Sequence, residues 1–152
     1  MVKKNYYLFL DIDNILFSGK RGIVPASALK AIQLARQNGS KVFLCSGRSK
    51  AEAAKYINYP VDGFVLGSGA WCMAEGNLVF DHPICNKDVN AISSLINQCE
   101  MGLLIAGQKH AYLERKCYQD IKYYVSGGKT DPRQQEEAMK ANHMISMKDR
   151  DL

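Results

Sequence analysis

The chain has 152 residues, of which 47% are hydrophobic, and this length and composition suit a compact globular protein with a sizeable core. Its formal net charge is +5, from 20 Lys and Arg residues against 15 Asp and Glu residues. The basic residues are scattered and form no stripe interleaved with aromatic residues. This pattern argues against nucleic acid as a partner, whereas a small anionic ligand agrees with the charge.

The N-terminus and the cysteines both indicate a cytoplasmic protein. The apolar stretch that follows "MVKKN" is soon interrupted by carboxylates, so it is too short for a signal peptide or a membrane span. The cysteines are odd in number and contain no C-x-x-C pair, which argues against a disulfide framework and a zinc knuckle. We expect free thiols at Cys45, Cys72, Cys85, Cys99 and Cys117.

Strand and helix patterns alternate along the first part of the chain. Apolar runs predict strands, and the first of these strands is expected to be buried on both faces. Pro25 and Gly39 mark the start and the end of the first helix. The predicted order is strand 6–12, helix 24–39, strand 41–45, helix 49–57 and strand 63–67. Such an order predicts an α/β fold, with right-handed crossovers and a Rossmann-like parallel sheet that carries helices on its faces.

The pattern changes after Gly69. Alternating residues around a Glu75-Gly76-Asn77 turn predict a β-hairpin within residues 70–84. Further on we predict a helix over 87–99, strands at 102–107 and 111–116, a helix that Asp131 caps, and a last strand at 143–147. This second region therefore has an α+β character.

Polar residues follow the first two predicted strands at the point where each strand ends. Asp11 and Asp13 close the first strand, and their like charges repel each other unless something compensates them. A hard divalent cation such as Mg²⁺ would compensate them, so both residues are candidate metal ligands. One carboxylate would then be able to attack an electrophile, and the other to transfer a proton.

The second of these clusters is Ser46-Gly47-Arg48, at the end of the strand over residues 41–45. Its hydroxyl and amides lie where the next helix is predicted to begin, which favours an anion cradle. Because ligands of parallel sheets bind at the carboxyl ends of the strands, we expect this phosphate-binding cradle close to the aspartate pair.

These residues resemble a known family. "DIDNIL" after one apolar strand and "LCSGRS" after the next look like the first two motifs of the haloacid dehalogenase (HAD) superfamily, D-x-D-G-T/V-L and T/S-G-R. The segment "DGFVLGSGAWCMAEGNLVFDHPI" resembles the Cof-type, family IIB sugar-phosphate phosphatases. The likeness runs from about residue 6 to residue 84 and is looser beyond. Asn14, Ile15 and Ser68 depart from the residues that the family usually has at these positions.

The resemblance implies a Mg²⁺-dependent phosphatase of small phosphorylated, sugar-phosphate-like metabolites. Asp11 would be the nucleophile that forms an aspartyl-phosphate, and Asp13 the general acid and base. The carboxylate of Asp11 and the backbone carbonyl of Asp13 would help to hold Mg²⁺, and Ser46 would bind the phosphoryl group. Residues 1–80 would form the N-terminal part of the HAD core, and residues 81–152 a partial α/β cap.

Two family features have no counterpart in the sequence: a Lys and an acidic metal-binding motif that follow the cap. The chain therefore looks like the first half of a core joined to most of a cap, and an alternative function is a catalytically dead HAD remnant that binds a phosphorylated ligand or a protein. A second copy of the chain could complete the exposed sheet edge that this arrangement leaves. A receiver domain is a third reading, but "GFVLGSGA" lacks the acceptor Asp that it requires.

Overall fold

The computed structural model describes residues 6–17, 23–99, 101–114 and 118–146. Contacts divide the chain into two compact units, which we treat separately. The first contains residues up to Arg48 together with Tyr56–His82, and the second contains Ser49–Lys55 and the residues from Pro83 onward. No helix in the described part of the chain has both the length and the apolar character needed to cross a membrane.

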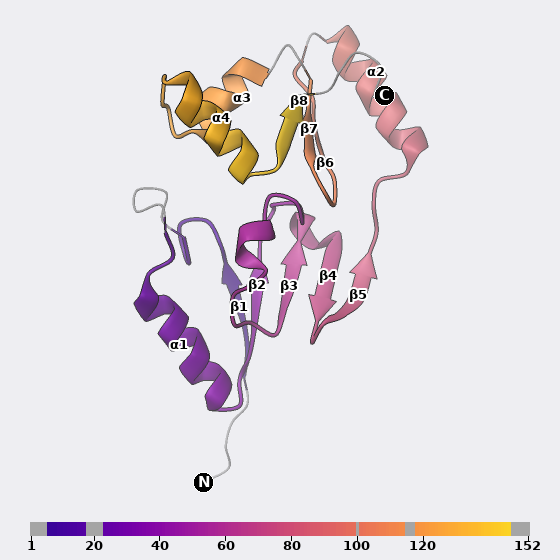
Figure 1. Cartoon of the computed structure of the whole chain (residues 1–152). Coiled ribbons are helices and arrows are strands. Elements are labelled where there is room, and N and C mark those ends of the chain that lie inside the picture. The colour runs from indigo at the N-terminus through magenta and orange to yellow at the C-terminus, as the bar shows by residue number, and fades with distance from the viewer. Residues whose placement is uncertain (1–5, 18–22, 100, 115–117, 147–152) are drawn as a thin grey trace. The chain divides into compact units, whose positions relative to one another are not determined.

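A five-stranded sheet forms the frame of the first unit in the described residues, with the strands in sequence order from β1 to β5 (Figure 1). The first three strands are parallel, as predicted, and the last two are antiparallel and form the predicted hairpin. Positive φ angles at Glu75 and Gly76 make its tight turn. The strands are β1 (Tyr7–Asp11), β2 (Lys41–Cys45), β3 (Gly63–Leu66), β4 (Trp71–Ala74) and β5 (Asn77–Asp81).

One face of this sheet carries the core. The helix α1 (Ala26–Gln37) contacts β2 and buries Ile32. Side chains on alternate positions of the central strands point to this face and are almost fully buried. They are Val42, Leu44, Phe64 and Leu66. The prediction of an α/β sheet is thus confirmed, and the crossover helix is where the sequence placed it.

The first strand corrects one prediction. The apolar run at its start indicated burial on both faces, but the residues of β1, which ends the sheet among the described residues, alternate between exposed and half-buried. Tyr7 and Phe9 lie on the face opposite the core and are strongly exposed. The pattern was read correctly as a strand, whereas burial depends on neighbours in space that a sequence run cannot specify.

The second predicted helix is also wrong. Residues 49–57 form turns and a short 3₁₀ helix at Ala54–Tyr56 instead of an α-helix. A capping box does form, because the Ser49 amide donates to Glu52 and the Glu52 amide donates to Ser49, at 2.9 and 3.3 Å. The segment then tightens into the 3₁₀ helix and ends in turns before Pro60.

The second unit has a three-stranded sheet in its described residues, in the order β6-β7-β8, with β6 antiparallel and β8 parallel to β7. Asp131 caps α4 by accepting from the Arg133 amide at 2.8 Å, as predicted, whereas α3 was not predicted. The predicted strand ends at 115–116 and 147 lie outside the described residues. The elements are α2 (Asn86–Gln98), β6 (Leu104–Ala106), β7 (Ala111–Leu113), α3 (Tyr118–Val125), α4 (Pro132–Ala141) and β8 (Met144–Ser146).

Candidate active site

The predicted site residues lie at the carboxyl ends of adjacent parallel strands. Asp11 is the last residue of β1, and the sheet register pairs it with Cys45, the last residue of β2. Ser46 follows directly. The first unit thus places the aspartate pair and the Ser46-Gly47-Arg48 loop at the same edge of the sheet.

A tight turn after β1 determines how Asp13 is presented. The amide of Phe17 donates to the carbonyl of Ile12 at 2.7 Å, and the amide of Asn14 donates to the carbonyl of Phe17 at 2.8 Å. Asn14 adopts a φ of 63°, a left-handed conformation that Asn tolerates better than most residues. Ile12 and Leu16 are buried and anchor the turn, which leaves the side chain of Asp13 41% exposed.

Asp13 is held by Arg48. The Arg48 guanidinium donates from Nε and Nη2 to the two carboxylate oxygens of Asp13, at 2.7 and 2.8 Å. Such a bidentate fork is strong and directional. Sequence reasoning missed this pair, because it assigned only the amide of Arg48 to the site. A sequence signal for this pair was present nonetheless. Arg48 follows the end of β2, and the carboxylates of Asp11 and Asp13 lie at the neighbouring end of β1.

The loop that carries Arg48 is fastened to the end of β3. Ser46 donates its amide to the carbonyl of Val65 at 2.9 Å, and Gly67 donates its amide to the carbonyl of Arg48 at 2.8 Å. The amide of Arg48 donates to Ser46 Oγ at 3.2 Å. Since no α-helix begins after Arg48, the helix terminus that we expected to support the anion cradle is absent from this loop.

Two further side chains form the surroundings of the site. Burial, followed by the charge of Asp11 and the proximity of Cys72, raises the pKa of the Cys45 thiol, which favours its protonated and unreactive form. Burial also raises the pKa of Tyr56 to about 12. The Tyr56 ring meets Phe17 edge-on, with centroids 6.0 Å apart, and so supports the turn that presents Asp13.

The described cysteines, Cys45, Cys72, Cys85 and Cys99, are free thiols, as predicted. Cys117 lies outside the described residues.

Oxygen donors are available for a metal ion. Within the described ranges, no group of three or more His, Cys, Asp or Glu side chains is arranged to hold a metal. Mg²⁺ needs fewer protein ligands than that, because it keeps several waters and binds through one or two carboxylates together with substrate phosphate. The carboxylate of Asp11 and an oxygen of Asp13 fit this chemistry.

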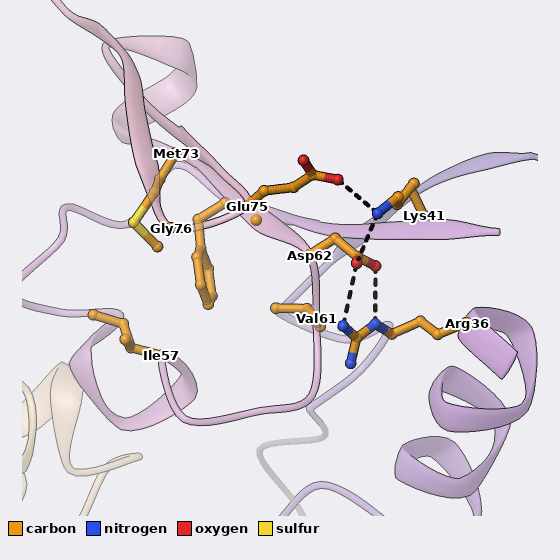
Figure 2. A pocket seen from close by; sticks show the side chains of 10 residues that line it. Arg36, Lys41, Ile57, Val61, Asp62, Met73, Glu75 and Gly76 are labelled. Carbon is orange, nitrogen blue, oxygen red and sulfur yellow. Dashed lines mark hydrogen bonds and ion pairs between the residues drawn. The ribbon is translucent and has the colours of Figure 1, made fainter. Parts of the chain in front are cut away.

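A separate cavity of about 360 Å³ lies at the opposite end of the sheet, where β2 and β3 begin (Figure 2). The carboxylate of Asp62 accepts two hydrogen bonds from Arg36 at 2.9 and 3.2 Å, and one from the amide of Val42 at 2.9 Å. Lys41 forms ion pairs with Asp62 and Glu75 at 3.7 and 2.6 Å. These charges compensate one another, so the cluster ties α1 to the strand ends and does not resemble the predicted phosphate site.

The hydrogen bonds of this cluster set the protonation state of Asp62. Burial raises the pKa of Asp62, but the hydrogen bonds from Arg36 and Val42 and the charges of Arg36 and Lys41 outweigh it, so the pKa is lowered. The hydrogen bond to Glu75 and the charge of that residue raise the pKa of Lys41. Both shifts favour the charged forms, which are the forms that make the ion pairs.

Several solved structures of HAD-superfamily proteins share this fold. A HAD-superfamily phosphatase from Bacteroides thetaiotaomicron aligns with a TM-score of 0.70 and 20% identity over 82% of this chain and 47% of its own. A HAD subclass IIB sugar phosphatase aligns with a TM-score of 0.63 and 18% identity over 91% of this chain and 64% of its own. A haloacid dehalogenase-like hydrolase from B. subtilis aligns with a TM-score of 0.68 and 16% identity, over 93% and 53%.

The chain spans about half the length of the first of these structures. No curated protein matches it. The model of the haloacid dehalogenase-like hydrolases matches residues 8–151, nearly the whole sequence, and includes both loops of the candidate site. With the parallel strands and the motif loops in the order that the family has, the chain belongs to the haloacid dehalogenase-like hydrolases.

Proposed function

We propose that the chain carries the nucleophile and the proton-transfer group of a HAD phosphatase that acts on small phosphorylated metabolites. The observation that supports this most directly is the meeting of the two motif loops. Asp11 and Asp13 end one parallel strand, Ser46 follows the next, and Arg48 joins the loops through its fork to Asp13.

In this proposal Asp11 attacks the phosphorus atom of a phosphomonoester. The bond from phosphorus to the ester oxygen breaks, and Asp13 gives its proton to the departing alkoxide. Asp13 then takes a proton from water, the hydroxide attacks the aspartyl-phosphate, and phosphate leaves as the Asp11 carboxylate is restored. Because both carboxylate oxygens of Asp13 accept hydrogen bonds from Arg48, we propose that the fork opens when Asp13 acts as the acid.

The remaining groups neutralise and position the phosphoryl group. Bound Mg²⁺ would supply positive charge to offset the repulsion between Asp11 and the phosphate. The carboxylate of Asp11 and the backbone carbonyl of Asp13 would hold it. Ser46 would donate its hydroxyl to a phosphoryl oxygen, next to Gly47 and Arg48. A sugar phosphate is the proposed substrate class, and the likeness to a subclass IIB sugar phosphatase supports it.

The same proposal assigns different roles to the two regions of the chain. Residues 1–80 would form the N-terminal part of the HAD core, which holds the chemistry, and residues 81–152 a partial α/β cap. The boundary between the two compact units after His82 supports this division, although Ser49–Lys55 belongs to the second unit. We also propose a cytoplasmic location, in keeping with the free thiols.

A second function is favoured by the occupancy of Asp13. Both oxygens of its carboxylate accept hydrogen bonds from Arg48, at 2.7 and 2.8 Å, so the proposed proton-transfer group is already engaged within the protein. The alternative is therefore a catalytically inactive module that binds a phosphorylated ligand or a protein.

The two functions are separated by assaying the purified chain against a panel of phosphomonoesters, with Mg²⁺ and with EDTA. The phosphatase proposal predicts turnover that EDTA removes and that Asp11→Asn abolishes. Asp120→Asn, an exposed substitution on α3, serves as the matched control and should leave turnover unchanged. Absence of turnover from folded protein that still binds inorganic phosphate in calorimetry would favour the binding module.

A further inference from the structure

Two histidines that are far apart in the sequence meet at one end of the sheet of the second unit. His110 directly precedes β7 and His143 directly precedes β8, and these two strands pair in parallel, side by side in Figure 1. The amide of Ala111 donates to the carbonyl of His143 at 2.9 Å, so the ladder continues to the histidines themselves. Their imidazole rings lie 6.5 Å apart between centroids, with 43° between the ring planes.

The backbone holds both histidines in place. The carbonyl of His110 accepts the amide of Gly107 at 2.9 Å, which closes the turn between β6 and β7. The amide of His143 donates to the carbonyl of Lys140 at 3.0 Å, and His143 has a φ of 53°. Because the hydrogen bond from Ala111 joins these two turns, the backbone keeps the two histidines as neighbours.

An aromatic neighbour orients one of the two rings. The ring of Tyr112 meets the ring of His110 edge-on, with centroids 6.2 Å apart and 78° between the planes. Tyr112 lies two residues after His110, so the two side chains share one face of the strand. The imidazole of His110 is therefore supported by packing, which leaves His143 as the ring that adjusts.

The separation of the rings is close to the separation that a shared metal ion requires. A Zn–N bond of about 2.0–2.1 Å places a ring centroid roughly 3.2 Å from the ion, so two rings on one tetrahedral ion lie roughly 5.3 Å apart. The observed distance of 6.5 Å exceeds this value by roughly 1 Å. A change in the side-chain torsions of His143 covers such a difference.

The donor atoms select the class of ion. Neutral imidazole suits borderline transition metals such as Zn²⁺ and Ni²⁺, whereas Mg²⁺ prefers oxygen. Within the part of the chain that the structure describes, no third His, Cys, Asp or Glu side chain completes a metal-binding group. Water would therefore occupy the remaining coordination positions.

We propose that His110 and His143 together bind one divalent transition-metal ion of the class of Zn²⁺ and Ni²⁺. The ion links the turn between β6 and β7 to the start of β8. The site uses none of the residues proposed for phosphoryl transfer, so it stands or falls independently of the proposed function.

NMR spectroscopy of the imidazole groups tests which histidines bind. The chain has three histidines, and the third, His82, lies outside the pair. Paramagnetic Ni²⁺, added below one equivalent to untagged protein, should broaden the signals of His110 and His143 and leave those of His82 sharp. This readout separates the pair from the thiols of Cys85 and Cys99, which also attract metals.

Calorimetric titration with Ni²⁺ tests whether the two histidines act as one site. His110→Gln and His143→Gln should each weaken binding at this site by at least about tenfold, since losing even a group that supports a metal ligand costs about 10–100-fold. The double variant should bind no more weakly than either single variant.

His82→Gln is the matched control and should bind Ni²⁺ like the wild type. Circular dichroism checks that each variant is folded. His143 lies at an exposed position, so its variant separates metal binding from packing.

Four results would overturn the proposal. They are equal broadening of all three histidines, single variants that each retain half of the bound Ni²⁺ as two independent sites would, an affinity that neither His110→Gln nor His143→Gln changes, and a loss of binding in His82→Gln that matches theirs.

Discussion

Arg48 is the residue that the structure adds to the predicted site. Its guanidinium compensates Asp13, so the repulsion between Asp11 and Asp13 is relieved in part by the protein itself. The second motif loop therefore also positions the carboxylate of Asp13, in addition to offering the hydroxyl of Ser46 and backbone amides to a phosphate.

We therefore expect Arg48→Lys to lower turnover by about tenfold or more, because an ammonium cannot reproduce the two-pronged hydrogen bonding of a guanidinium. Steady-state kinetics on the best phosphomonoester of the panel will measure this. Arg133→Lys, an exposed position on α4, is the control and should have wild-type rates. Equal rates for Arg48→Lys and the wild type would contradict a role for the fork in turnover.

A second prediction for a single residue concerns the contribution of Asp62 to stability. Asp62→Asn should cost about 2 kcal/mol in the free energy of unfolding, since it weakens a hydrogen-bonded charge whose side chain is only 7% exposed. Glu75→Gln in the same cluster should cost less than about 1 kcal/mol, because the Glu75 side chain is 63% exposed. Urea denaturation of the three proteins compares the two costs, and a larger effect at Glu75 would refute the assignment.

The lowered pKa of Asp62 also predicts that the stability of the protein depends on pH. The pKa of Asp62 is lower in the folded protein than in the unfolded chain, so the carboxylate contributes stability above the unfolded value of about 4. That contribution is lost as the pH falls through the lower folded value. Stability measured between pH 6 and about pH 2 should therefore fall less steeply in Asp62→Asn than in the wild type, and parallel curves would exclude this linkage.

At the scale of the elements, the turn after β1 depends on the backbone of Asn14. Its φ of 63° is costly for most side chains, so Asn14→Ala should lower stability by about 1 kcal/mol. Asn14→Gly should be tolerated, because Gly adopts this conformation without steric cost. Thermal unfolding of both variants measures the difference, and a more stable Ala variant would mean that the turn relaxes to a different conformation.

The sequence predicted elements well where a local signal determines them. Pro25 began α1 within one residue, Asp131 capped α4, and the Glu75-Gly76 turn closed the hairpin. It failed where the answer depends on distant neighbours. The pattern of residues 49–57 indicated a helix that the structure does not have, and the apolar run of β1 indicated a burial that this strand does not have.

The positions of the candidate site residues were predictable from the sequence, but their side-chain contacts were not. The placement of Asp11, Asp13 and Ser46 at strand ends followed from periodicity and from the topology of parallel sheets, and the structure has them there. The pairing of Arg48 with Asp13 and the absence of a helix after Arg48 did not follow. Both depend on side-chain directions and loop conformations that residue types alone leave open.

For the whole molecule, the account is that of a HAD-family chain whose two motif loops meet at the carboxyl ends of adjacent parallel strands. Its central claim is that Asp11 becomes phosphorylated. Catalysis by a covalent intermediate requires this, while ligand binding alone does not.

The most direct test is mass spectrometry of the protein quenched in acid during turnover of a phosphomonoester with Mg²⁺. The account predicts one added phosphoryl group, located on the peptide that contains Asp11, present in the wild type and in Asp120→Asn and absent from Asp11→Asn. Turnover without a phosphorylated peptide, or a phosphoryl group on a residue other than Asp11, would contradict it.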